Sequence, residues 1–149
     1  MKISTLPRKT GECIINWLKE NWPIGIDLGS SKGIMGMDVG NGDQLLFSEN
    51  IKALKRKPAI VPFLGTCEIL KRFPKIVVDS GAVRHVCNGA DVMRPGILSF
   101  PDSFNEGDIV VIQEGKHEKY IAVGLAILSS SAAKISSKGV VINNMHYVG

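Results

Sequence analysis

The chain has 149 residues, which is enough for one ordinary domain or two small ones. Apolar residues make up 44% of it, which excludes wholesale disorder, yet no apolar run reaches the roughly 18 residues that span a bilayer. The formal net charge of +4 lies entirely in residues 1–73, which hold 11 Lys and Arg against 7 Asp and Glu. Because residues 74–149 hold seven of each sign, anionic partners are favoured and the two halves are expected to do different work.

A single amphipathic helix is predicted near the start of the chain. Thr10 is a suitable N-cap, Ile14 and Leu18 fall on one side at helical spacing, and Pro23 ends the segment. The residues before this helix include no apolar run of signal-peptide length, so we expect a cytoplasmic protein without membrane contact.

Short strands and turns are predicted between this helix and residue 73. Glycines divide residues 24–48 into short strands, with GNGD at Gly40–Asp43 as a hairpin turn. A basic patch at Lys52–Lys57 is either a solvated surface turn or an RNA contact. A strand over residues 59–65 and a short helix over 66–73 follow.

The second half begins after Pro74, the predicted boundary between domains 1–73 and 74–149. Short strands with one clear helix favour a small closed or half-closed barrel. A hairpin is expected around Glu114–Lys119. Strands are predicted at 75–79, 97–100, 108–113, 120–128 and 139–148, a helix at 80–89, and one helical turn within 129–139.

The sequence offers no convincing catalytic, metal or cofactor site. GIDLGSSKG at 25–33 is similar to the phosphate-binding hairpin of actin-type and Hsp70-type ATPases, but the chain has no room for the two lobes of that fold. A small hydrolase would lose ATP turnover on Asp27→Ala, and we expect no turnover. His85 and Cys87 lie two apart on a predicted helix, so they do not face each other.

The three cysteines, an odd number at wide spacing, make neither a disulfide framework nor a Cys-x-x-Cys metal pair. We expect reduced, partly buried thiols at Cys13, Cys67 and Cys87.

The run GAVRHVCNGADVMRPGI at 81–97 suggests a binding surface. Gly89 and Gly96 let the backbone approach a bulky partner closely, and Arg94 supplies charge beside them. Composition alone gives equal weight to the alternative, in which the glycines serve tight turns and Arg94 is a solvated charge.

The second half resembles the PUA domain, an RNA-binding module. The matching stretches are KIVVDSGAVRHVCNGADVMRPGI, GDIVVIQ, YIAVGLAIL and KGVVINNMHYVG, in the family's order. VPFLGTCEILKRFP, which precedes them, resembles the join in the malignant T-cell amplified sequence family and its relative ligatin. The resemblance implies an α+β, mainly β fold in which a small α/β N-terminal domain precedes a PUA-like pseudobarrel of five or six strands. It implies neither catalysis nor a cofactor.

The resemblance also implies which residues face RNA. From the family these are Gly81, Ala82, Gly89, Ala90, Asp91, Val92, Met93, Arg94, Pro95, Gly96, Met145, His146 and Tyr147. On charge alone, Lys75 and Arg84 are added as phosphate contacts. Arg94→Glu is expected to weaken RNA binding without unfolding the chain.

The sequence therefore predicts a non-catalytic RNA-binding protein that is associated with translation. Its partners would be structured RNA, either the tRNA acceptor end or small-subunit rRNA, together with the small ribosomal subunit and a translation-factor partner protein. Two alternatives stay open: a PUA accessory protein that assists RNA modification, and a protein-interaction adaptor whose RNA binding is incidental.

Overall fold

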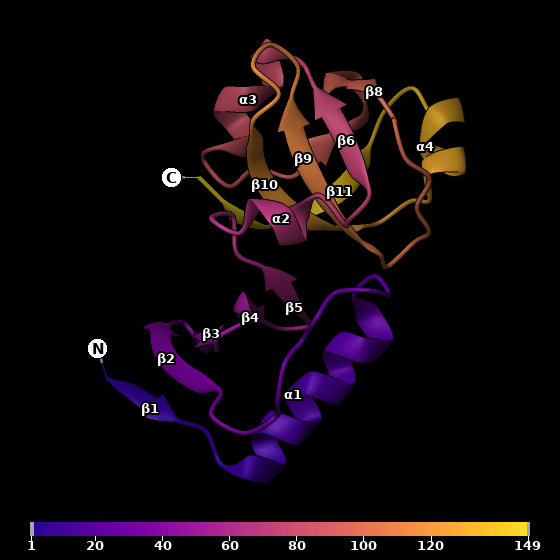
Figure 1. The fold of residues 1–149 in the computed structure, drawn as a ribbon. Helices are drawn as coiled ribbons and strands as arrows, with labels where there is room; N and C mark the ends of the chain where they lie inside the picture. Colours follow the sequence, from indigo (N-terminus) through magenta and orange to yellow (C-terminus); the bar gives the residue numbers. More distant parts are fainter. Residues whose placement is uncertain (1, 149) are drawn as a thin grey trace. The chain divides into compact units, whose positions relative to one another are not determined.

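The computed structural model describes residues 2–148. The chain divides into two compact units, Met1–Arg72 and Phe73–Gly149 (Figure 1). Within the described residues, no helix is both long enough and apolar enough to cross a membrane.

The first unit is a five-stranded sheet with one long helix. The strands pair antiparallel in chain order, so each neighbour in the sheet is also the neighbour in sequence. The described residues of this unit thus form two helices and a sheet in which every strand pair is antiparallel. Its elements are β1 (Ile3–Thr5), α1 (Arg8–Asn21), β2 (Met35–Gly40), β3 (Asp43–Phe47), β4 (Lys52–Arg56), β5 (Ala59–Pro62) and α2 (Cys67–Leu70).

Helix α1 begins earlier than the sequence predicts. Its N-cap is Pro7 and not Thr10: Pro7 is extended, with ψ 149°, and its carbonyl accepts the first helical bond from the Gly11 N–H over 3.0 Å. Ile14 and Leu18 are buried as expected. At its end, the Trp22 indole N–H donates to the Ile60 carbonyl over 2.8 Å, which fastens the helix to β5.

The hairpin predicted at Gly40–Asp43 is confirmed, since these two residues are partners in the β2–β3 ladder. Asn41 and Gly42 between them both have positive φ, as a two-residue hairpin turn requires. The prediction of strands upstream was wrong: residues 24–34 contain no strand. There the Asp27 carboxylate accepts from the Gly29 N–H over 3.0 Å and fixes a turn.

The predicted basic patch at 52–57 is largely a strand, β4, and its side chains do not share one face. Lys52 lies 4.4 Å from the Phe63 ring centroid. Arg56 pairs with Asp43 over 3.5 Å. Lys55 points to the opposite face, because side chains alternate along a strand.

The second unit contains the six-stranded sheet β7-β11-β10-β9-β6-β8. Strand β6 pairs parallel with β9 and antiparallel with the edge strand β8, so it lies between two strands that follow it in the chain. This confirms the predicted mainly β, PUA-like pseudobarrel. Its elements are β6 (Lys75–Val78), α3 (Ser80–Val86), β7 (Val92–Met93), the 3-10 turn η1 (Arg94–Gly96), β8 (Ile97–Ser99), β9 (Ile109–Glu114), β10 (Tyr120–Ala126), α4 (Ser130–Ile135) and β11 (Val140–Tyr147).

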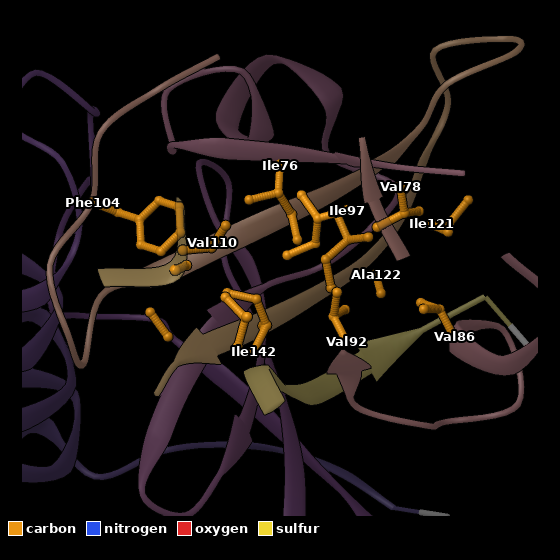
Figure 2. Close-up of a cluster of buried hydrophobic side chains, with 14 residues drawn as sticks. Ile76, Val78, Val86, Val92, Ile97, Phe104, Val110, Ile121, Ala122 and Ile142 are labelled. Atoms are coloured by element: carbon orange, nitrogen blue, oxygen red, sulfur yellow. The ribbon is translucent and has the colours of Figure 1, made fainter. Parts of the chain in front are cut away.

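Aliphatic side chains from nearly every element of this unit form one buried cluster. In Figure 2, Ile76, Ile97 and Ile142 lie in the middle of the cluster, with Phe104 at one end and Val86 of α3 at the other. The cluster holds α3 against the sheet, which positions the loop that follows it.

The cysteines differ in part from the prediction. Cys87 is partly buried against the aliphatic cluster, whereas Cys13 and Cys67 are exposed. His85 is exposed on α3, so the pair rejected as a catalytic site also lies in two different environments.

Glu114 closes the β9–β10 hairpin. Its carboxylate accepts backbone N–H bonds from Lys116, His117 and Lys119. Burial raises the pKa of this carboxyl, but the three N–H donors stabilise the anion and hold the pKa below its usual 4.5.

A lowered pKa makes the stability of the hairpin depend on pH in a defined direction. The contribution of Glu114 is complete above the unfolded pKa near 4.5 and is lost as the pH falls through the lower folded value. We therefore expect Glu114→Gln to destabilise the protein near neutral pH and to flatten the fall in stability below about pH 4.5. Urea unfolding across that range measures this. Glu118→Gln, an exposed carboxyl in the same turn, is the control and should follow the wild type.

Candidate nucleic-acid interface

Helix α3 and the loop after it enclose a groove of about 470 Å³, here called the α3 groove. Most of its lining side chains are small or apolar, and the lining contains no Lys or Arg. The lining residues are Asp79, Gly81, Ala82, His85, Val86, Ala90, Asp91, Val92, Met93, Pro95 and Gly96.

The helical wall of the α3 groove starts at an N-cap. The Asp79 carboxylate accepts from the Ala82 N–H over 2.9 Å, which fixes the first turn of α3. Opposite it, Gly96 approaches so closely that a Cβ there would lie 2.9 Å from the Cβ of Ala82. Position 96 therefore has no room for a side chain while Ala82 stands opposite it.

The loop wall is tied to β11 by Asn144. Its side-chain NH₂ donates to the carbonyls of Val86 and Ala90, both over 3.0 Å. Its backbone N–H donates to the Asp91 carboxylate over 2.9 Å. These three bonds hold the end of α3 and the start of the loop on the last strand.

The Arg94 guanidinium is bound within the fold. Nε donates to the Ala133 carbonyl over 2.7 Å and Nη1 to the Ile97 carbonyl over 3.3 Å, and the group lies 5.2 Å from the Phe100 ring centroid. Arg94 also does not line the groove. The structure thus gives Arg94 a structural role, and Arg94→Glu is expected to destabilise the fold, contrary to the prediction from sequence.

Gly89 and Tyr147 form a second contact that the sequence could not specify. Gly89 has φ +93°, and a Cβ there would lie 3.0 Å from two carbons of the Tyr147 ring. The ring of Tyr147, which is 38% exposed, therefore covers the glycine beside the loop.

The structure brings together eight of the predicted RNA-facing residues and leaves the others elsewhere. Met145 is buried. Val92 is among the lining residues, but its side chain is also buried. Lys75 donates to the Phe73 carbonyl over 3.0 Å and lies 3.8 Å from Asp102, so it is engaged outside the groove. Arg84 is exposed. The eight groove residues are Gly81, Ala82, Ala90, Asp91, Val92, Met93, Pro95 and Gly96.

Three lining residues were missed by the sequence reasoning: Asp79, His85 and Val86. Helical spacing could have found the last two, because positions three and four after Ala82 share its face of α3. Asp79 could have been found as the residue just before the predicted helix.

Comparison with known proteins identifies the family. Residues 74–148 match the PUA domain, and the chain belongs to that family. A crystal structure of a hypothetical protein from Pyrococcus horikoshii has the same fold, with a TM-score of 0.79 and 25% identity over 98% of this chain and 94% of that one.

Three curated relatives match this chain, and two of the matches, at 65% and 73% of it, are longer than the PUA domain. An uncharacterized protein of Methanocaldococcus jannaschii is 39% identical over 65% of this chain and 60% of that protein. Translation machinery-associated protein 20 of Schizosaccharomyces pombe is 33% identical over 52% of this chain and 45% of that protein. The Drosophila melanogaster malignant T-cell-amplified sequence 1 homolog is 33% identical over 73% and 59%. The resemblance to that family is thereby confirmed, and the alignments span about half to three-fifths of the relatives' own lengths.

An enzyme also shares the PUA part of the chain. A probable tRNA pseudouridine synthase B of Pyrobaculum aerophilum is 39% identical over 50% of this chain but only 22% of the enzyme. The similarity therefore covers the PUA part of the enzyme and does not include its catalytic part. Among residues 2–148, no group of three or more His, Cys, Asp or Glu side chains is placed to hold a metal ion.

The role of Arg94 can be measured by stability. Arg94→Met keeps much of the side-chain bulk but removes donors from two carbonyls, and we expect it to lower the free energy of unfolding by about 1–3 kcal/mol. Arg84→Met removes the same charge from an exposed position without a partner among the described residues, and should stay within about 0.5 kcal/mol of the wild type. Equal effects of the two substitutions in chemical denaturation would contradict the structural role of Arg94.

Proposed function

From its membership of the PUA domain family, we propose that this chain is a non-catalytic RNA-binding protein associated with translation. The α3 groove takes the unpaired end of a structured RNA, and the tRNA acceptor end is our first candidate. The observation that carries the proposal is the lining of the groove, which combines small side chains, exposed backbone and two carboxylates without any Lys or Arg.

A groove of this kind suits a base and a ribose better than a phosphate. Met93 is 47% exposed at its edge and offers an apolar surface to a base. Asp79 and Asp91 would repel a phosphate, whereas their carboxylates can accept hydrogen bonds from ribose hydroxyls. A terminal nucleotide with free 2′ and 3′ hydroxyls therefore matches the groove.

Phosphate contacts are proposed for the rim. Arg84 is exposed on α3 and has no partner among the described residues, so its charge is available to the RNA backbone. His146 and Tyr147 at the end of β11 complete the proposed surface, and Gly89 and Arg94 support it from within the fold. Met145, being buried, contributes packing only.

The whole protein is proposed to work as two domains. The names of the relatives support a place in the translation machinery, where the PUA domain would hold RNA and the first unit would meet ribosomal RNA or a partner factor. The alternative role in RNA modification would require a partner enzyme, because the match to a pseudouridine synthase covers only its PUA part.

The first test measures whether binding depends on the 3′ end of the RNA. Filter binding would compare one tRNA with an intact 3′ CCA end, the same tRNA trimmed of that end, and the intact tRNA carrying a 3′ phosphate, over a salt series. We expect the intact end to bind about tenfold more tightly than either altered end, with the preference kept as salt rises. Equal binding of the three RNAs that disappears with salt would mean that only net charge is recognised.

A charge-matched pair of variants locates the site. Met93→Glu places a negative charge at the edge of the α3 groove and should remove most of the preference for the intact end, a loss of about tenfold. Ile135→Glu makes the same change at a residue that is 89% exposed and outside the groove lining, and should bind as the wild type does. A Met93→Glu protein that binds normally would place the RNA elsewhere.

A further inference from the structure

The first unit has a pocket of about 230 Å³ between α1 and the turn from β4 to β5. One wall is a single face of α1, formed by residues at helical spacing. The other wall is the β4–β5 turn with its two neighbouring strand ends. The lining residues are Thr10, Cys13, Ile14, Trp17, Lys55, Lys57, Pro58, Ala59 and Ile60.

Trp17 within α1 and Trp22 at the C-terminal end of that helix have different roles. Trp22 is buried and its indole N–H is bonded to a carbonyl, so it is part of the fold. Trp17 is only partly buried, and its indole N–H has no acceptor among residues 2–148. A large ring that is partly exposed, with an unused donor, offers both a stacking surface and a hydrogen bond.

The two lysines of the pocket are also unused. Neither the Lys55 side chain nor the Lys57 side chain makes a hydrogen bond or an ion pair with any described residue, and no acidic side chain lines the pocket. Lys55 and Ile60 are direct partners in the β4–β5 ladder, so the Lys55 side chain stands on the same face as the apolar pocket floor.

Three other cations of this unit are paired with carboxylates. Arg8 pairs with Glu12 over 3.2 Å, Arg56 with Asp43 over 3.5 Å and Lys71 with Glu68 over 3.3 Å. The two lysines of the pocket have no such acidic partner, and they share the lining with Trp17.

We propose that this pocket binds one nucleotide, with the base against the Trp17 ring and the phosphate between Lys55 and Lys57. A pocket of this volume is smaller than the roughly 300 Å³ at which drug-sized sites begin, so it has room for one ring system. An aromatic face with adjacent cations is the usual arrangement for holding a base and its phosphate. The nucleotide is either free or part of a single-stranded RNA.

The inference does not depend on the α3 groove, because every residue of the pocket lies in the first unit and the two sites share no side chain. It gives the first unit a direct contact with nucleic acid, where a purely structural unit would have none.

Two exposed cysteines allow a direct test. Cys13 lines the pocket and Cys67 on α2 does not, so Cys67 is an internal control for alkylation by iodoacetamide, followed residue by residue by mass spectrometry. The probes are adenosine, adenosine monophosphate, inorganic phosphate and a single-stranded RNA of about six nucleotides.

We expect adenosine monophosphate or the RNA to slow alkylation of Cys13 about tenfold at saturation and to leave Cys67 unchanged. Protection by the monophosphate indicates a free nucleotide, whereas protection by the RNA alone indicates a nucleotide within a chain. Failure of both to protect Cys13, or equal slowing at Cys67, would overturn the proposal. If adenosine protects Cys13 at the same concentration as adenosine monophosphate, the phosphate adds nothing to binding. That result would show that the two lysines take no part in the site.

Variants separate the two parts of the pocket. Trp17→Ala and the pair Lys55→Gln with Lys57→Gln should each raise the dissociation constant of the protecting probe about tenfold. The pair Lys9→Gln with Lys19→Gln changes the same charge on exposed positions of α1 outside the pocket lining and should have no such effect. Because Trp17→Ala removes packing, Trp17→Phe is a second variant that should keep most of the binding. Equal weakening by both lysine pairs would show net attraction without a site.

Met93→Glu distinguishes this site from the α3 groove. It should leave the protection of Cys13 unchanged, whatever it does to the binding of tRNA.

Discussion

The α3 groove depends on a bulge in the last strand. The register between β10 and β11 shifts between Val123 and Gly124, so the ladder passes from His146 to Asn144 and skips Met145. Gly124 permits this, because a Cβ there would collide with the carbonyl of Asn143. At the bulge, Asn144 holds the end of α3 and the loop by its side chain. A bulge that redirects one side chain in this way determines where the whole loop lies.

Local patterns were sufficient to predict most elements of the second unit. β6, α3, β9, β10 and β11 follow from β-branched runs, one helical period and turn residues, and the family resemblance supplied their arrangement as a pseudobarrel. Three strands were missed: β4, which the sequence analysis took only as a basic patch, and β1 and β7, which have only three and two residues. Such strands exist because a distant partner pairs with them, and no local pattern reports a distant partner.

The candidate site was located by its glycines, but the direction of its side chains could not be predicted. Regular alternation along β11 would give Met145 the same exposure as Asn143 and Tyr147, and the bulge is the reason it is buried. Arg94, a charged residue in a glycine-rich loop, was expected to contact a partner at the surface. The carbonyl that accepts its hydrogen bond belongs to Ala133, 39 residues further along the chain. Both outcomes are set by tertiary contacts, whereas the omission of His85 was avoidable from helical spacing.

The two units differ in charge and, under the proposed function, in what each contributes to RNA binding. In the second unit Arg94 and Lys75 are bound within the fold, and the groove lining contains two carboxylates and no Lys or Arg. Under the proposed function, shape and hydrogen bonding would supply recognition inside the groove. The net charge of +4 comes from the first unit, where two lysines stand unpaired beside Trp17. Attraction to a polyanion falls with salt while shape recognition does not. A protein that keeps these two contributions on separate units can search for RNA with one and select its end with the other.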